Sequence, residues 1–246
     1  MEKQKLDRLK KIAADVRLDI LEEVHSASSG HPGGSLSIAD ILTYLYFEEM
    51  NVDPKAPKCP DRDRLVLSKG HTAPALYAVL AEKGFFDKAE LKKLRHVDSF
   101  LQGHPDMKGT PGVDMTTGSL GLGFSAACGI ALAAKLDGKN YRTYAILDLN
   151  KLQIDGPIAE VMNPMPHDTK FEAFGFHVII IDGHNFEQIE AAINEAKTVK
   201  GKPTVIIAKT VKGKGVSFME NQVGWHGSAP NDEQYAQAIA EIKATM

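Results

Sequence analysis

Short apolar runs alternate with longer amphipathic segments through the second half of this 246-residue chain, and this alternation limits the folds open to it. The apolar runs, which predict strands, lie at 141–147, 177–182 and 204–211. The amphipathic segments, which predict helices, lie at 168–175, 185–199 and 232–245. Strands that alternate with helices are typical of a parallel or mostly parallel sheet covered by helices. We therefore expect an α/β fold with a mostly parallel sheet flanked by helices.

The first half adds helices around one short strand. Apolar side chains at steps of three and four predict an amphipathic helix over 4–27, which ends at the breaker cluster SSGHPGG. Ser37, with Asp40 three residues later, resembles a capping box and predicts a helix that runs to about Phe47. Further elements are a buried strand at 64–68 and helices at 72–83, 88–95 and 124–136. Since no repeat or linker interrupts the chain, we expect one domain over residues 1–246.

Composition excludes several classes of function. The net charge is −3, from 29 basic and 32 acidic side chains, which does not indicate the basic surface of a nucleic-acid-binding protein. No apolar run approaches the ~20 residues of a membrane span, and the charged N-terminus lacks the apolar centre of a signal peptide. Cys59 and Cys128 lie far apart and form no metal or redox spacing. These features favour the reducing cytoplasm, with no nucleic-acid or membrane partner.

Four histidines beside glycines are the candidate chemical groups. His71 follows the predicted strand at 64–68, and His31, His104 and His226 lie in loops. Ligands of open α/β sheets bind beyond the carboxyl ends of the strands, and glycine neighbours allow a ligand to approach closely. Histidine transfers protons near neutral pH. On these residues alone the chain is an α/β enzyme with an unknown ligand, and each histidine also has a purely structural interpretation.

Other motifs are weaker. The GLG of residues 118–124 follows a loop rather than a strand, so it lacks the context of a dinucleotide-binding fingerprint. The KGKGVSF segment lacks the spacing of a phosphate-binding P-loop. His184 follows the strand at 177–182 and either joins a site or orders the turn into the next helix.

Several longer segments occur together and in a fixed order. They are SSGHPGGSLSIADIL, DRDRLVLSKGH, QGHPDMKGTPGVDMTTGSLGLG, NKLQIDGP, IDGHNFEQIEAAI and KTVKGKGV followed by WHGSAP. In this combination they resemble the N-terminal, diphosphate-binding domain of transketolases, and the resemblance covers nearly all of the chain. Transketolases move a two-carbon ketol unit between sugar phosphates with thiamine diphosphate and a divalent metal. The resemblance thus implies a transferase with these cofactors, magnesium being the metal that suits oxygen ligands and phosphates.

The resemblance also assigns roles to residues. His31, His104 and His226 would face the hydroxyls and the carbonyl of the substrate, with His226 also near the diphosphate. His71 would lie beside the diphosphate. The backbone of Gly118, Ser119 and Leu120 would hold the aminopyrimidine. Asn150 and the carbonyl of Leu152 would bind the metal that bridges the diphosphate.

One departure from the family pattern lies between Leu147 and Asp148. In transketolases the corresponding strand leads into a Gly-Asp-Gly motif, whose aspartate binds the metal, and a helix and a strand follow before the Asp-x-Asn element. Here the two residues are adjacent, although such an excursion would occupy roughly 25–40 residues. We expect a local rearrangement over 145–170 and poor binding of cofactor and metal, unless Asp148 replaces the aspartate.

Whole transketolases continue into a pyrimidine-binding domain and a C-terminal domain. The resemblance therefore predicts an N-terminal subunit of a split transketolase, inactive alone, whose partner is a separate C-terminal subunit and whose substrates are sugar phosphates. A homodimer is also expected, since it would cover surface exposed by the shortened sheet. Two alternatives stay open. One is a non-catalytic, cofactor-free scaffold, and the other is a related enzyme such as a dihydroxyacetone synthase or a deoxyxylulose-phosphate synthase.

Overall fold

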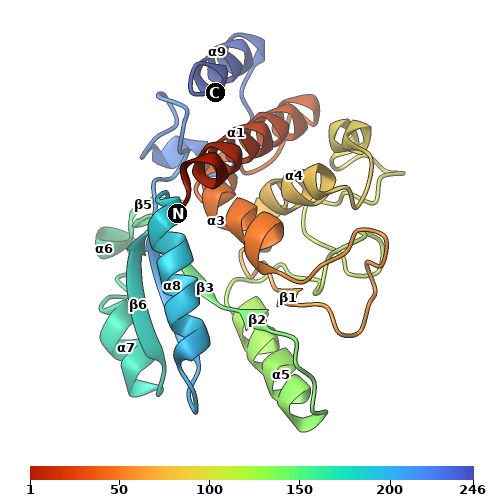
Figure 1. Ribbon diagram of the computed structural model, residues 1–246. Coiled ribbons are helices and arrows are strands. Elements are labelled where there is room, and N and C mark those ends of the chain that lie inside the picture. The colour runs from red at the N-terminus through yellow and green to blue at the C-terminus, as the bar shows by residue number, and fades with distance from the viewer.

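The computed structural model describes residues 1–246 and has an α/β architecture, with parallel strands flanked by helices (Figure 1). The α-helices are α1 (Lys3–Ser26), α2 (Pro32–Leu36), α3 (Ala39–Tyr44), α4 (Ala73–Lys83), α5 (Leu122–Leu136), α6 (Ile158–Val161), α7 (His167–Ala173), α8 (Phe186–Thr198) and α9 (Asp232–Lys243). Shorter helical turns are η1 (Leu45–Glu49), η2 (Gly70–Thr72), η3 (Lys88–Lys93) and η4 (Val223–Trp225). None of the helices is long and apolar enough to cross a membrane.

The strands form three small sheets. They are β1 (Arg64–Leu65), β2 (Thr143–Tyr144), β3 (Ile146–Leu149), β4 (Leu152–Gln153), β5 (Gly156–Pro157), β6 (His177–Asp182) and β7 (Thr204–Lys209). β1 pairs with β2 in parallel, and the order β3-β7-β6 is also parallel, with Ile206 opposite both Ile146 and Ile179. β4 and β5 form an antiparallel hairpin inside the 145–170 region, where the sequence predicts a rearrangement.

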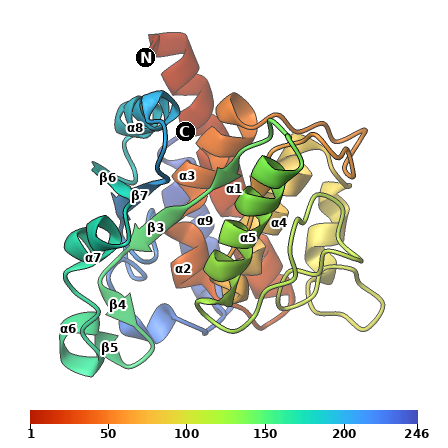
Figure 2. The ribbon, with the colours of Figure 1, turned by 90° about the horizontal axis from the view of Figure 1, so that it is seen from below.

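A single extended segment belongs to two sheets. β2 and β3 are separated only by Ala145, yet β2 pairs with β1 while β3 pairs with β7. Figure 2 shows this segment crossing diagonally from the neighbourhood of α5 toward β7. The sequence predicts one strand over 141–147. The observed segment instead leaves its first partner after Tyr144, because its continuation is hydrogen-bonded to β7.

The helix predicted from Ser37 begins later. Its first residue is Ala39, and no side chain caps it. The Ser37 hydroxyl donates instead to the Asp148 carboxylate at 2.7 Å, with the Gly34 carbonyl also within reach at 3.0 Å. The capping-box prediction was therefore wrong, because a tertiary contact takes the hydroxyl that would cap the helix. The strand expected at 64–68 is also shorter, and ends at Leu65.

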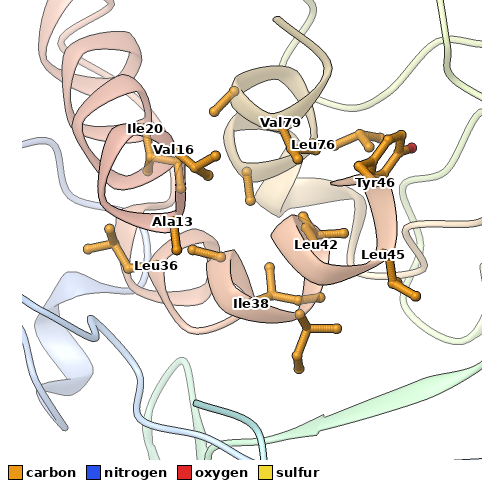
Figure 3. Packing of buried hydrophobic residues seen from close by; sticks show 14 of the residues in the cluster. Ala13, Val16, Ile20, Leu36, Ile38, Leu42, Leu45, Tyr46, Leu76 and Val79 are labelled. Atoms are coloured by element: carbon orange, nitrogen blue, oxygen red, sulfur yellow. The ribbon is translucent and has the colours of Figure 1, made fainter. Parts of the chain in front are cut away.

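The main core packs α1 against the short helices that follow it and against α4. Figure 3 shows Val16 and Ile20 of α1 facing Leu76 and Val79 of α4, with Leu42 of α3 beside them. All five side chains are essentially inaccessible to solvent. Burial of each such aliphatic side chain stabilises the fold by roughly 1.5–3 kcal/mol. This helical core is formed mostly by the first half of the chain and supports the loops that lead out of it.

A buried polar network connects α1 and α3 to the sheet. The Arg17 guanidinium pairs with Asp40 at 2.6 Å, and His184 Nδ1 donates to the same carboxylate at 2.7 Å. The backbone N–H of Val211 donates to His184 Nε2 at 2.9 Å, which fixes the tautomer. Burial by itself would raise the pKa of Asp40, but Arg17 and His184 outweigh it and lower the pKa to about 2. His184 therefore orders the turn after β6.

Glu23 is the least satisfied charged group of this core. Its side chain is fully buried in α1, and neither carboxylate oxygen has a hydrogen-bond partner. Burial, and then the negative charges of Asp19 and Glu22, raise the pKa of Glu23 well above its usual 4.5. The folded chain therefore holds this carboxyl protonated at pH values where the unfolded chain ionises it, which destabilises the fold as pH rises.

Glu23→Gln is expected to raise the free energy of unfolding by about 1–3 kcal/mol near neutral pH, because it removes this proton uptake. The gain should vanish below the ordinary pKa of 4.5, where both states of the parent are protonated. Urea unfolding across this pH range measures the effect. The matched control is Glu22→Gln, since Glu22 is half-exposed and pairs with Lys92. A gain that does not depend on pH would contradict the assignment.

Candidate active site

A cavity of about 600 Å³ opens where β3 ends and where the loop after β1 turns into α4. Its wall includes His31, His71, His226, Gly118, Leu120, Asn150, Leu152, Lys69, Asp148 and Lys212. Its volume lies in the range of small-molecule sites. The cavity also lies beyond the carboxyl end of a parallel strand, where ligands of α/β proteins bind.

Three imidazoles meet in this cavity. The ring centroids of His31 and His71 are 5.0 Å apart, those of His31 and His226 are 5.3 Å apart, and those of His71 and His226 are 5.2 Å apart. The three residues come from the loop before α2, from η2 and from the residue after η4. A Cβ on Gly33 would lie 2.7 Å from the Trp225 carbonyl oxygen, so the glycine is needed for the first loop to approach the last.

The imidazoles are neutral at physiological pH. Burial, followed by the positive charges around them, lowers the pKa of His31 to about 4 and that of His71 to about 3. Burial and the charge of Lys212 also lower the pKa of His226. His31 Nδ1 is buried and has no hydrogen-bond partner. The cavity therefore offers imidazole nitrogens that can accept a proton or a hydrogen bond from a ligand.

Two lysines lie in the cavity wall, and Lys212 carries the charge that no carboxylate balances. Lys212 is almost fully buried, and its Nζ lies 3.3 Å from His226 Nδ1. Lys69 donates to the Gly34 carbonyl at 2.6 Å and forms an ion pair with Asp148. The sequence interpretation named neither lysine, although Lys69 lies inside the SKGH segment that carries His71. Anionic groups are favoured in a wall of this kind.

Asp148 is committed to the protein itself. One of its oxygens accepts from Ser37 and Lys69, and the other accepts from the Thr210 hydroxyl. Burial by itself would raise the pKa of Asp148, but the ammonium of Lys69 and these hydrogen bonds lower it. The carboxylate is thus ionised and already neutralised by Lys69, so it is not a free metal ligand.

The remaining oxygens do not make a magnesium site. Asn150 Oδ1 accepts a hydrogen bond from the N–H of Leu152 at 3.0 Å, and the chain has no group of three or more His, Cys, Asp or Glu side chains able to hold a metal ion. Magnesium demands near-octahedral oxygen coordination, usually with one or two carboxylates. The imidazoles, the lysines and the glycine loop suit the anionic end of a diphosphate, whereas the donor set does not suit its metal.

His104 and Ser119 lie outside the cavity wall. His104 is exposed at the rim, where its carbonyl accepts from the Tyr77 hydroxyl at 3.1 Å, and its charge contributes to the low pKa of His31 and of His71. Ser119 is exposed between Gly118 and Leu120, which do line the cavity. Of the residues singled out from sequence, seven share the cavity: His31, His71, His226, Gly118, Leu120, Asn150 and Leu152.

The neutrality of the histidines is testable by NMR titration of the imidazole nitrogens. His31 should titrate with a midpoint near 4 and His71 near 3. Lys212→Met should raise the pKa of His226, because it removes the nearest positive charge and leaves the burial. Lys243→Met, at the exposed end of α9, is the matched control and should leave the pKa of His226 unchanged. Midpoints above pH 6 for His31 and His71 in the folded chain would contradict the account.

Comparison with known proteins gives this site its family context. The family model for the transketolase thiamine diphosphate binding domain matches residues 9–145 and 141–244. A 6-deoxy-6-sulfo-D-fructose transketolase subunit from Clostridium sp. is 43% identical over 273 positions, which span 99% of this chain and 98% of the relative. Human transketolase is 39% identical over 98% of this chain but only 43% of its own length.

Solved structures agree with the sequence relatives. Transketolase from Campylobacter jejuni matches with a TM-score of 0.90 and 32% identity, covering 99% of this chain and 43% of its own. The chain thus spans about two-fifths of the single-chain transketolases and nearly all of the Clostridium subunit.

The Clostridium alignment has 273 positions against 246 residues here, so at least 27 positions have no counterpart in this chain. The two family matches meet at 141–145, next to this shortened region. By sequence and by fold, the chain is a member of the transketolase family and corresponds to its thiamine diphosphate binding domain.

Proposed function

We propose that this chain is the N-terminal subunit of a two-chain transketolase that transfers a two-carbon ketol unit between sugar phosphates. The observation that carries the proposal is the cavity in which three neutral imidazoles converge at the end of β3. The relatives that match this chain over almost their whole length support it. The Clostridium protein is named a transketolase subunit. A protein of Phocaeicola vulgatus, 38% identical over 92% of this chain, is named as one subunit of an apulose-4-phosphate transketolase.

The histidines have distinct proposed roles toward the substrate. His31 and His226 are placed to hold the substrate hydroxyls and carbonyl, since both line the cavity and both are neutral. His104 at the rim would contact the sugar after it enters. The apolar side chain of Leu120 borders the same opening.

Other residues would hold the cofactor, which supplies a stabilised carbanion at its thiazolium ring when bound. His71 would bind a diphosphate oxygen, with Lys212 supplying positive charge. The backbone of Gly118, Ser119 and Leu120 would orient the aminopyrimidine. Asn150 and the Leu152 carbonyl would be two of the metal ligands once the missing segment supplies a carboxylate.

We also propose that this single domain lacks a segment between Leu147 and Asp148 and binds cofactor and magnesium poorly as a result. The alignment positions without a counterpart support this, as does the capture of Asp148 by Lys69. The same two observations favour a second candidate, a folded scaffold without catalysis. A related thiamine-dependent synthase would differ in the sugar phosphates it accepts.

A separate C-terminal subunit is the proposed partner, and a homodimer is the proposed assembly. Apolar side chains along one exposed side of α5 support an interface there: Leu122, Leu132 and Leu136 are 66%, 57% and 78% exposed. Contiguous exposed apolar surface of this kind marks interaction sites. Cys59 and Cys128 are both unpaired, which fits a reducing cytoplasm.

The test is a ketol-transfer assay with a C-terminal transketolase subunit, thiamine diphosphate and magnesium. The chain is compared with a version that carries the Clostridium relative's segment between Leu147 and Asp148. The restored version should be active and the chain itself should not be. His226→Asn in the restored version should lower kcat by roughly 100-fold or more, because it removes a proton-transfer and hydrogen-bonding group.

His96→Asn is the matched control, since His96 is exposed and does not line the cavity, and it should leave kcat unchanged. An inactive restored version would contradict the proposed function. Equal activity of the two versions would contradict the proposed impairment.

A further inference from the structure

The backbone diverges at one point between the two parallel sheets. β1 and β2 pair only at Arg64–Leu65 with Thr143–Tyr144. Beyond that point residues 66–69 continue without a partner strand, while β3 turns away to pair with β7. The two backbone segments therefore border an opening in what would otherwise be one parallel sheet.

On one side, the opening is bordered by residues 66–69, some of whose backbone groups make no hydrogen bond. Residues 64, 66 and 68 direct their backbone groups toward the β2–β3 side, and the C=O of Val66 and both backbone groups of Ser68 make no backbone hydrogen bond there. Leu67 between them directs its backbone groups to the other edge, where its carbonyl accepts from the Thr117 hydroxyl at 2.7 Å. A row of unpaired peptide groups of this kind is what a sheet edge presents to an incoming strand.

The other border of the opening, β3, also has backbone groups without a partner strand. The carbonyls of Ala145 and Leu149 accept from Ile206 and Thr210, so alternate residues of this segment are directed at β7. Ile146 and Asp148 between them direct their backbone groups to the opposite edge of β3, where no strand pairs. Both borders of the opening are therefore competent to pair with one further strand.

An apolar cavity of about 230 Å³ fills the space between these borders. Ile38 and Leu42 of the α3 region line it from one side, and Phe124 and Ala127 of α5 line it from the other. Figure 1 shows α3 and α5 on opposite sides of the β2–β3 segment. Because 14 of its 17 lining residues are hydrophobic, the cavity favours a segment that is apolar on both faces. Central strands of parallel sheets have this character.

The position of the opening coincides with the shortened region of the sequence. At least 27 alignment positions of the Clostridium relative have no residue here, and the two family matches overlap at 141–145, at the start of the β2–β3 segment. A stretch of that length is long enough for one strand and one helix. The spatial opening and the sequence gap therefore fall at the same place.

We propose that the opening between residues 66–69 and β3 is a strand-binding slot. It binds an extended apolar peptide that belongs to a separate molecule and runs parallel to β3. Such a peptide would pair its backbone with both borders, as in β-strand addition. Its side chains would alternate between α3 and α5. The ligand is thus a strand of about five or six residues in which every position is apolar.

The experiment uses a fluorescein-labelled synthetic peptide with the sequence that the Clostridium relative has opposite the gap. Fluorescence anisotropy should show saturable binding to the purified chain without cofactor, metal or partner protein. The same peptide with proline at two alternate strand positions should bind at least ten-fold more weakly, because proline cannot donate to a neighbouring strand. Hydrogen exchange should slow at Ser68 and at Ile146 and Asp148 when the unmodified peptide is bound.

A chain variant gives a second, independent control. Ala127→Phe places a ring in the slot and should weaken peptide binding at least ten-fold, whereas Ala131→Phe, on the exposed side of α5, should not. Circular dichroism and the melting temperature verify that both variants are folded. If Ala127→Phe does not fold, the comparison of the unmodified peptide with the proline peptide tests the proposal instead.

Three results would overturn the proposal: no peptide binding, equal binding of the proline peptide, or protection of Ser68 that depends on protein concentration alone. The last would mean that a second copy occupies the slot. Because the assay contains no substrate or C-terminal partner, its outcome is separate from that of the ketol-transfer assay.

Discussion

The continuity of the backbone from Thr143 to Leu149 is the constraint on which the rest of the structure depends. One extended segment pairs first with β1 and then with β7, so the two parallel sheets are held by the same seven residues. The Asp148 carboxylate is thereby placed in contact with Lys69, Ser37 and Thr210, which neutralise its charge and donate hydrogen bonds to both of its oxygens. The change of pairing partner also separates β3 from residues 66–69 and leaves an apolar opening between α3 and α5.

The histidine cluster does not depend on that segment. His31, His71 and His226 are held by loops that leave the helical core and by close contacts that glycines permit, so they meet although the sheet is divided. The result is a pocket with two separable halves. The half formed by imidazoles and lysines suits phosphate and sugar groups, and the half formed by Asn150 and Leu152 lacks the carboxylate that magnesium needs.

Much of this fold is predictable from the sequence, because periodicity and local capping decide its larger elements. The long helix α1, the helices α4 and α5, and the strand–helix–strand of β6, α8 and β7 all lie within a few residues of the predicted ranges. Asn185 caps α8, and Asn231 forms a capping box with Gln234 at the start of α9. In these elements short-range preference and tertiary packing agree.

The rest depends on contacts between residues far apart in the chain. Ser37 has the local pattern of a helix cap, but Asp148 takes its hydroxyl from 111 positions away. The division of 141–147 between two sheets follows from pairing with β7, which no local pattern encodes. In the cavity, three of the glycine-flanked histidines lie together, yet the Lys69–Asp148 pair was missed and His104 lies at the rim. Burial of a lysine or an aspartate is not visible in a sequence without its tertiary partners.

We propose that direct joining of Leu147 to Asp148 removes the metal half of a transketolase cofactor site and leaves the histidine half intact. Calorimetric titration of thiamine diphosphate into the chain, with and without magnesium, tests it most directly. The account predicts weak binding that magnesium does not strengthen, and tight, magnesium-dependent binding once the Clostridium segment is inserted at the junction. Micromolar, magnesium-dependent binding to the chain as it stands would contradict it.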